Sequence, residues 1–299
     1  MKGRKVMKKI LALVLAVVML ACCFVSCGKT NADFVATDAT DLLKEDFGIA
    51  VKKGNSALLA AVNAVVDEWV ANGTMTKYVD YYTALADYEA GVEGVAKPEA
   101  GDLKVSWDFG TATETITVYT ESGFAPFEFI SNGKVIGVDI AIMSQVALNM
   151  GKKLDVQDVL FDTIPTCVQQ ATGDAVGAAG LTINDERKEA VDFSSIYYSS
   201  TLVIVSAKDA PIASVKDLSG KKVAVQEGTS GDLIISAAAT ADGHVYEGDD
   251  GEVKVTVDAA TEVVRYKQYA LALADLKAGR VDAILMDKLP ALTMLAVAD

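Results

Sequence analysis

From Ile116 to the end of the chain, short apolar and β-branched runs alternate with segments whose apolar residues recur at helical spacing. We expect Asp139 to cap one of the helices. The strand-like runs stand at residues 116–120, 154–159, 176–179, 201–206, 222–226, 263–266 and 281–286. Such alternation predicts α/β sheets with ligand sites at the carboxyl ends of strands. The 299 residues allow one large or two small domains with a real core.

The first 113 residues have a different layout. Residues 33–37 and 48–51 predict short strands, and Asn55 or Ser56 can cap a helix that ends at an Asn-Gly pair. Residues 90–113 are interrupted by glycines and a proline, so we expect a linker there. A hairpin is expected at 244–257.

The N-terminus predicts a secretory signal over residues 1–27. Five basic residues precede an uncharged, mostly apolar run that is too short for a confident membrane span. The run ends in small residues before Cys27, a pattern that resembles a lipidation site. Cys22 is a rival site, and a plain signal peptide or an uncleaved anchor is the alternative. We therefore expect an extracytoplasmic protein held at the cell membrane by a lipid, with residues 28–32 as a tether.

Composition argues against several classes of function. The formal net charge of −14 argues against binding to the phosphates of nucleic acids. His244 is the only histidine and lies outside every motif described below, so neither a catalytic triad nor a histidine-rich metal site is supported. We expect no cofactor, no metal and no catalysis.

Four blocks of sequence resemble, in order, the bacterial extracellular solute-binding proteins of family 3, which bind amino acids for ABC importers. The blocks are TESGFAPFEF at 120–129, GLTINDER at 180–187, VAVQEGTSG at 223–231 and AGRVDAILMD at 278–287. The resemblance implies an α/β, two-lobed fold of the type II periplasmic-binding-protein class. Each lobe would be a mixed sheet flanked by helices.

Two segments stand in the opposite order to that of the family. EDFGIAVKKGN at 45–55 resembles a segment near the family's C-terminus, whereas ETITVYTE at 114–121 resembles its opening strand. The resemblance therefore implies a circular permutation. A truncated gene fused to a duplicated tail is the alternative.

The permutation fixes the expected domain boundaries. Lobe 2 would comprise residues 33–38 and 207–299, and lobe 1 residues 45–89 and 114–205. Residues 90–113 would join the ancestral ends. The expected crossings between the lobes are 38–46 and 205–209.

The resemblance also implies how a bound amino acid is held. Arg187 would pair with the ligand carboxylate, because its planar fork suits bidentate binding. Thr182, Thr229 and Ser230 would add donors, the last two at a helix start. Asp287, at the end of a strand, would accept from the ligand ammonium. Taken alone, Arg187 could lie on a solvated face, and Thr229, Ser230 and Asp287 could be helix caps.

Five further residues match positions around the ligand. The Gly180 carbonyl would share the ammonium, and Phe124 and Phe161 would sandwich the ligand side chain, although both could be core residues. Glu121 matches an acidic position that contacts the ammonium or a polar side chain. Gln226 replaces a lysine found in some members, which leaves the ligand's identity open. Glu121 and the two aromatic residues favour a polar or cationic amino acid.

The expected function is capture of an amino acid by hinge closure and its delivery to an ABC permease, by a protein expected to be a monomer. Two alternatives use the same fold. One is a ligand-sensing module, and the other is an enzyme similar to cyclohexadienyl dehydratases, for which Glu121 would be the candidate acid.

Overall fold

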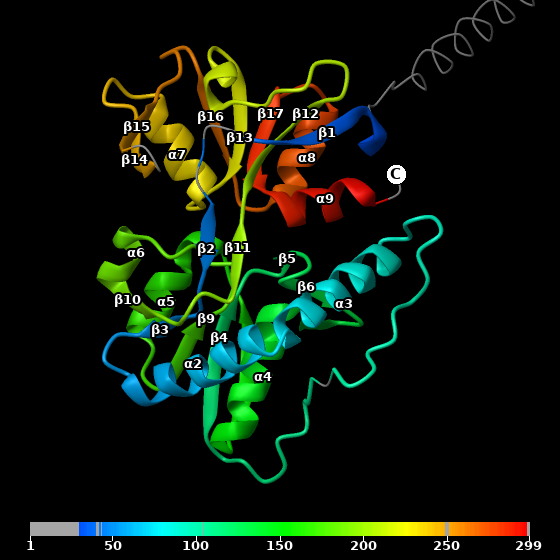
Figure 1. Ribbon diagram of the computed structural model, residues 1–299, viewed down its shortest axis with the longest axis vertical. Coiled ribbons are helices and arrows are strands. Elements are labelled where there is room, and N and C mark those ends of the chain that lie inside the picture. Colours follow the sequence, from blue (N-terminus) through cyan, green and yellow to red (C-terminus); the bar gives the residue numbers. More distant parts are fainter. Residues whose placement is uncertain (1–29, 40–41, 43, 104, 249–250, 298–299) are drawn as a thin grey trace, which may run out of the picture.

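The structure, a computed structural model, describes residues 30–297 except 40–41, 43, 104 and 249–250. It has two lobes, one above the other in Figure 1, each built on its own sheet. Cys27, Cys22 and the expected signal segment lie outside the described residues.

The lobe-1 sheet is mixed. Its strand order is β10 (Val191–Phe193), β3 (Ala50–Lys52), β9 (Asp174–Gly177), β4 (Thr115–Thr120) and β8 (Lys153–Asp158). β4 runs parallel to β8 and β9, whereas β3 runs antiparallel to both of its neighbours. The front segment of the chain therefore supplies a strand to this lobe.

The lobe-2 sheet is also mixed. Its strand order is β1 (Phe34–Asp38), β12 (Leu202–Ala207), β17 (Ala283–Asp287), β13 (Lys222–Gln226) and β16 (Glu262–Tyr266). β13 is parallel to β16 and β17, and β12 is antiparallel to β1 and β17. β1, from the front of the chain, is an edge strand in the same sheet as β13. Two mixed sheets with helices on them confirm the expected fold class.

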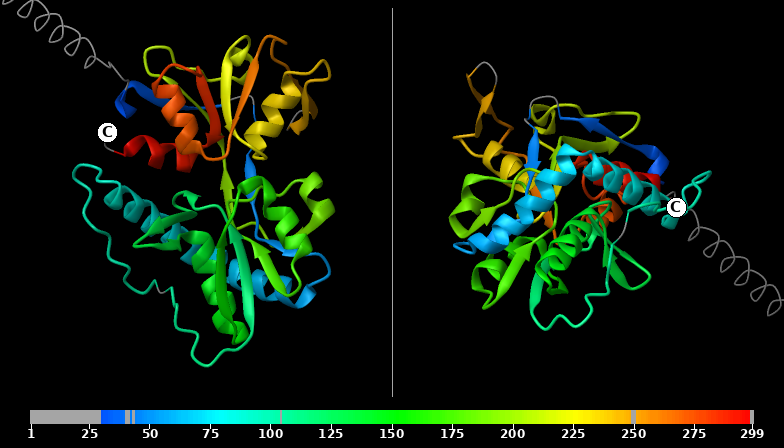
Figure 2. Two further views of the ribbon diagram at one scale, coloured as in Figure 1. Left: turned by 180° about the vertical axis from the view of Figure 1, so that it is seen from behind. Right: turned by 60° about the horizontal axis from the view of Figure 1, so that its bottom comes forward.

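Helices cover both sheets. In lobe 1 they are α2 (Ser56–Ala71), α3 (Thr74–Glu89), α4 (Val138–Met150), α5 (Ile164–Gln170) and α6 (Asp185–Ala190). In lobe 2 they are α7 (Ser230–Ala238), α8 (Tyr269–Lys277) and α9 (Lys288–Ala296). Short 3-10 turns stand at η1 (Asn31–Asp33), η2 (Phe161–Thr163) and η3 (Val215–Leu218). Figure 2 shows the same arrangement from behind and from below.

Two small sheets complete the fold. β5 (Gly123–Phe124), β6 (Glu128–Ser131) and β7 (Lys134–Ile136) form one on lobe 1, and β14 (His244–Gly248) with β15 (Gly251–Val255) forms the other. The second is the expected hairpin, and α7 packs against β14.

The α2 helix shows how local sequence fixes the front of lobe 1. The Asn55 side chain accepts a hydrogen bond from the Leu58 N–H at 3.2 Å and donates to Asp174 at 2.7 Å, which fastens the start of the helix to β9. The buried positions Leu58, Val62, Val65, Val66 and Trp69 recur at helical spacing. Gly73 then takes a left-handed conformation with φ of +77°, which ends the helix.

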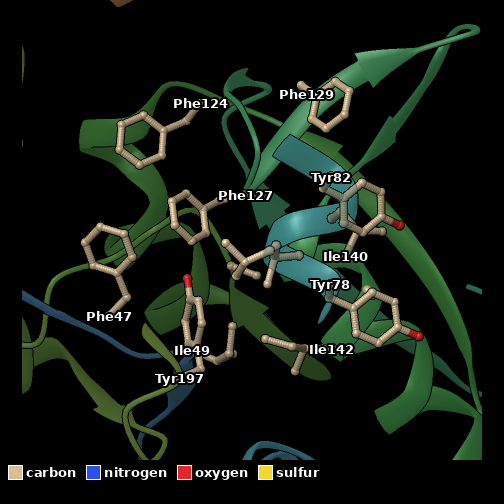
Figure 3. Packing of buried hydrophobic residues seen from close by; sticks show 14 of the residues in the cluster. Phe47, Ile49, Tyr78, Tyr82, Phe124, Phe127, Phe129, Ile140, Ile142 and Tyr197 are labelled. Atoms are coloured by element: carbon tan, nitrogen blue, oxygen red, sulfur yellow. The ribbon is translucent and has the colours of Figure 1, made fainter. Parts of the chain in front are cut away.

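An aromatic cluster joins the front of the chain to the rest of lobe 1 (Figure 3). Phe47 is fully buried, and its ring meets Phe127 edge-on at a centroid distance of 5.2 Å. The rings of Tyr197 and Phe124 also lie within 6.4 Å of Phe47. Residues on both sides of the linker thus share one hydrophobic core.

The lobes are joined by a two-stranded ribbon, in which β2 (Glu45–Phe47) pairs with β11 (Tyr198–Ser200). The ribbon runs between the two lobes in Figure 1. The expected crossing at 205–209, and the lobe-1 boundary at residue 205, are therefore wrong. The strand at 202–206 belongs to lobe 2, because its apolar run is buried between β1 and β17. The other crossing strand, β2, begins inside the expected 38–46 and extends one residue beyond it.

The expectation that Asp139 caps a helix is also wrong. Gly137 holds the N-cap position of α4, and Asp139 lies inside the first turn with its side chain fully buried. The Asp139 carboxyl accepts hydrogen bonds from the Gly180 N–H and the Tyr197 hydroxyl instead. A carboxylate at the start of a helix can serve tertiary contacts rather than its own helix end.

Two features concern the segments that the permutation would rearrange. The Asn31 side chain is buried and donates a hydrogen bond to the Val297 carbonyl at 2.7 Å, so residue 31 lies against the end of α9. Residues 90–113 contain no helix or strand in their described part and pass along the outside of lobe 1 (Figure 2). They are fastened to α4, where the Ser144 hydroxyl donates to the Ser106 carbonyl at 2.8 Å.

Candidate ligand-binding site

Arg187 lies between the lobes and is not on a solvated face. Asn184 caps α6 by accepting from the Arg187 N–H, which orients the start of this short helix. The guanidinium, in a residue that is 7% exposed, donates to the Thr182 carbonyl at 2.7 Å and across the cleft to the Gly228 carbonyl at 2.9 Å. It also stands over the Phe161 ring at 5.4 Å, a cation–π contact. Burial lowers the pKa of Arg187, and the nearby Glu45 charge opposes that shift.

Both lobes and the hinge meet at Thr182. Its hydroxyl donates to the Glu45 carboxylate at 3.0 Å and accepts from the Ser230 hydroxyl at 3.0 Å. Glu45 comes from hinge strand β2, and Ser230 from the start of α7 in lobe 2. This chain of hydrogen bonds therefore links three separate parts of the fold at one point.

Asp287 ends strand β17 and faces the same region. Its side chain makes no cap hydrogen bond to α9, which weakens the alternative that it serves only as a helix cap. One carboxyl oxygen is buried and has no hydrogen-bond partner among the described residues. Burial, and then the nearby Glu45 charge, raise the pKa of Asp287 well above its usual range, while Ser200 and Arg187 lower it. Burial also raises the pKa of Glu45.

A second acidic position stands where Glu121 follows strand β4. Its carboxylate, 3% exposed, accepts from the side-chain amides of Gln226 at 3.1 Å and Gln268 at 3.0 Å, both in lobe 2. Burial raises the pKa of Glu121, and these two amides oppose the shift. The lobes are thus in contact here as well as at Arg187.

An aromatic pair closes the space between these polar groups. The Phe124 ring of lobe 1 stacks on the Tyr269 ring of lobe 2 at 6.3 Å and 26°. Gly180 packs under Phe124, because a Cβ at that position would come within 2.7 Å of the ring, and its φ of +55° favours glycine. Thr229 caps α7 by accepting from the Asp232 N–H and also accepts from the Tyr269 hydroxyl at 3.4 Å.

These contacts bring the expected residues together between the two lobes. Gln226, Thr229, Ser230 and Asp287 come from lobe 2, and the remainder come from lobe 1: Glu121, Phe124, Phe161, Gly180, Thr182 and Arg187. The described residues contain no helix that is long and apolar enough to cross a bilayer. The same part of the chain has no group of three or more His, Cys, Asp or Glu residues that could hold a metal ion.

Comparison with known proteins agrees with this geometry. The family model of the bacterial extracellular solute-binding proteins, family 3, matches residues 116–284, which is more than half of the chain. The chain belongs to this family. The match begins after residues 30–89, yet that front segment supplies strands to both lobes.

Two of the similar proteins are named as arginine-binding proteins. The arginine-binding extracellular protein of Bacillus subtilis is 38% identical over 110 residues, covering 37% of this chain and 43% of that protein. The L-arginine-binding protein of Pseudomonas aeruginosa is 30% identical over 178 residues, covering 59% and 62%. The chain thus spans less than two thirds of the length of either relative.

Solved structures of amino-acid-binding proteins are also similar to this chain. The arginine-bound form of truncated ArgBP from T. maritima matches with 32% identity and a TM-score of 0.51, over 61% of this chain and 77% of that one. An ancestral arginine-binding protein bound to arginine matches with 34% identity and a TM-score of 0.52, over 62% and 77%.

Three residues at the candidate site were not expected from the sequence. Glu45 stands two residues before Phe47, the first residue of the FGIAV segment, and reaches the site because the hinge strand β2 carries it there. Gln268 and Tyr269 stand at the start of α8, outside the four blocks. Their place at the site follows only from their contacts with Glu121 and Phe124 across the two lobes. Glu45 had one sequence signal, since it is an acidic residue beside a motif of a crossing segment.

Proposed function

We propose that this protein captures an amino acid with a cationic side chain outside the cell membrane, with arginine as the leading candidate, and delivers it to an ABC permease. The observation that carries the proposal is the placement of three buried carboxyl groups and one guanidinium between the lobes. They belong to Glu45, Asp287, Glu121 and Arg187. Buried charges are costly unless paired, so this set suits a ligand with two positive groups and one negative group.

The ligand would lie with its carboxylate toward Arg187 and its ammonium toward Asp287. The unpartnered oxygen of Asp287 supplies an acceptor for the ammonium. A cationic side chain would then extend past Phe124 and Phe161 toward Glu121. The names of the arginine-binding relatives support this choice of ligand.

Capture would depend on hinge motion about the β2–β11 ribbon. Because Arg187 and Glu121 belong to lobe 1 while Asp287 and Gln226 belong to lobe 2, a ligand that touches all four binds the closed state more tightly than the open state. A ligand can shift a conformational equilibrium only through such differential affinity. The protein would bind and release its ligand without turnover.

The proposal is tested by isothermal titration calorimetry against arginine, lysine, histidine, glutamine and cystine. Arginine should bind most tightly, and Glu121→Gln should weaken arginine binding more than glutamine binding, because only the cationic side chain loses a charge partner. Failure of the wild-type protein to bind any of the five, or equal losses for arginine and glutamine, would contradict the proposal.

Replacing Arg187 with Ala should weaken arginine binding by roughly 2–5 kcal/mol, the cost of truncating one member of a buried charge pair. Lys188→Ala is the matched control, because the Lys188 side chain is next in sequence, is exposed, and forms an ion pair with exposed Asp185. Titration calorimetry compares both variants with the wild type. Unchanged affinity in the Arg187 variant would refute its role at the ligand carboxylate.

We further propose that the fold is circularly permuted, with the lobes formed as expected apart from the corrected boundary at residue 205. The hydrogen bond from Asn31 to the Val297 carbonyl supports continuity between α9 and β1. The restriction of the family match to residues 116–284 supports displacement of the segment before it.

Attachment to the membrane through lipidated Cys27, with Cys22 as the alternative, is part of the same proposal, as is a monomeric state. Labelling of cells with a radioactive fatty acid tests the attachment. Loss of label in Cys27→Ala, but not in Cys22→Ala, is expected.

A further inference from the structure

We propose that Asp139 is a positioning residue that holds the Gly180 turn of the ligand site and the lobe-1 end of the hinge in one fixed arrangement. One carboxyl oxygen, Oδ2, accepts from the Gly180 N–H at 2.9 Å and from the Tyr197 hydroxyl at 3.0 Å. Its consequence for ligand affinity rests on the function proposed above. Its consequence for the Gly180 turn does not.

The start of α4 fixes where this carboxyl lies. Gly137 has a φ of +138°, and a Cβ there would come within 2.1 Å of the Phe127 carbonyl, so only glycine allows this close approach. The Asp139 N–H donates to that same carbonyl at 3.1 Å. The helix is therefore anchored by its backbone, and the Asp139 side chain points into the interior with no exposed surface.

On one side, the carboxyl holds the turn that leads into the site. Gly180 stands two residues before Thr182, whose carbonyl and hydroxyl contact Arg187 and Glu45. The Gly180 backbone is in the left-handed region beneath the Phe124 ring. The hydrogen bond to Asp139 thus fixes the direction of the Gly180 peptide, which leads to Thr182 and its contacts with Arg187 and Glu45.

On the other side, the carboxyl holds the base of the hinge. Tyr197 directly precedes β11, its N–H donates to the Phe47 carbonyl at 3.0 Å, and its ring packs against Phe47 and Phe127. The Tyr197 hydroxyl donates a hydrogen bond to Asp139. Both strands of the ribbon are therefore fixed at their lobe-1 end, where Tyr197 lies beside Phe47 and Phe127 (Figure 3) and donates to the Asp139 carboxyl.

Burying a carboxyl group at this position costs free energy, so we infer that Asp139 serves a specific purpose. The second oxygen of Asp139 is buried without a hydrogen-bond partner among the described residues, and the same holds for both carboxyl oxygens of Glu128 on β6. Burial, and then the nearby Asp139 charge, raise the pKa of Glu128 well above its usual range. An apolar side chain would fill the space at lower cost, but it would leave two buried donors unpaired.

The first experiment measures amide hydrogen exchange at Gly180 by NMR, in the protein without ligand. Asp139→Ala should speed this exchange by about tenfold, because it leaves the buried Gly180 N–H without its acceptor. Asp139→Asn keeps an acceptor and should restore slow exchange. Ser144→Ala is the control, because it removes a partly buried hydrogen bond from the same helix without touching the turn.

The second experiment measures arginine affinity in a double-mutant cycle with Tyr197→Phe, a variant that removes one hydroxyl and nothing else. We expect Asp139→Ala to weaken binding by about tenfold and Ser144→Ala to leave it unchanged. The loss in the double variant should be smaller than the product of the single losses, because the two groups act through one bond.

Each outcome decides the proposal. Unchanged Gly180 exchange in Asp139→Ala overturns it, as does equally fast exchange in Asp139→Asn and Asp139→Ala. Should Asp139→Ala fail to fold, Tyr197→Phe is measured in its place, because it removes the hydrogen bond that joins the hinge to Asp139. Arginine affinity that is unchanged in Tyr197→Phe then overturns the role of Asp139 at the hinge. If the wild-type protein does not bind arginine, the proposed ligand fails, while the exchange measurement still decides the role of Asp139.

Discussion

Glu45 and Asp287 form a buried acidic pair between the hinge and lobe 2, within reach of Arg187. Each carboxyl is desolvated, and the Glu45 charge raises the pKa of Asp287. Two acids with one guanidinium leave an excess of negative charge. A ligand ammonium placed there would neutralise this excess, and the pair would then act as a joint acceptor rather than Asp287 alone.

Glu45→Gln should therefore weaken arginine binding by about 1.5–3 kcal/mol, the range for a hydrogen bond to a charged group, while keeping the hydrogen bond from Thr182. Asp46→Asn is the matched control on the same strand, because Asp46 accepts from Ser199 at 2.6 Å on the exposed side of the ribbon. Titration calorimetry measures both. Equal losses in the two variants would mean that the hinge, and not the charge at Glu45, is affected.

The raised pKa values of Glu45, Asp287 and Glu121 predict opposite pH effects on binding and on stability. As pH falls, these acids become protonated at higher pH than an exposed carboxyl, so affinity for a cationic ligand should fall. The folded protein binds these protons more readily than the unfolded chain. The stability that they contribute is present at low pH and is lost as pH rises through their folded pKa values.

Titration calorimetry and thermal unfolding of the ligand-free protein, both between pH 8 and pH 5.5, check this prediction. Arginine affinity should decline toward pH 5.5, while the melting temperature should hold or rise. A melting temperature that falls in parallel with affinity would show that other groups dominate.

At the scale of elements, the start of α2 offers a test of local stability. Asn55→Ala removes the helix cap and the bond to Asp174, so we expect a loss of about 1–2 kcal/mol in the free energy of unfolding. Asn72→Ala removes an exposed hydrogen bond to the Thr74 N–H and should cost less. Urea unfolding followed by circular dichroism measures both. A larger loss in the Asn72 variant would show that the cap is not the stabilising feature.

Most elements could be predicted because their residues carry local signals. The alternation after Ile116, the Asn55 cap and the Asn-Gly stop of α2 depend on near neighbours in sequence. The strand β12 could be predicted, but its lobe and the role of Asp139 could not be assigned correctly, because both depend on partners far along the chain. β12 pairs with β1, about 170 residues earlier, and Asp139 accepts from residues 41 and 58 positions away.

The residues of the candidate site also divide into those that local sequence signals could place and those that depend on distant segments. Arg187 and Asp287 could be placed because they lie within recognisable blocks. Glu45 and Gln268 could not, because each reaches the site through the meeting of separate segments at the hinge or across the cleft. Sequence patterns describe neighbours on an element, whereas a site between lobes depends on how whole elements are brought together.

For the whole molecule, the proposed permutation can be reversed. A chain that begins at residue 90, runs to 297, passes through a short Gly-Ser link to residue 30 and ends at 89 restores the family order. We expect it to fold and to bind arginine with an affinity within about threefold of the original, because permutation is tolerated at exposed connections. Thermal unfolding and titration calorimetry check both.

The control is a chain opened inside strand β4, between residues 117 and 118, with the same link. It should not fold, because β4 is an interior strand of its sheet that pairs with both β8 and β9. If the chain opened at 89 and 90 behaves like this control, the proposed continuity between α9 and β1 is wrong.

The exposed course of residues 90–113 makes the protein separable into two pieces. A protease cut within this segment would leave one piece with β1, β2, β3 and Glu45, and a second piece with all the site residues expected from the sequence. Neither piece alone would hold a complete site, because the Glu45–Thr182 bond spans the cut. Reassociation of the fragments would therefore restore binding, so the protein could serve as a complementation reporter whose signal requires both halves.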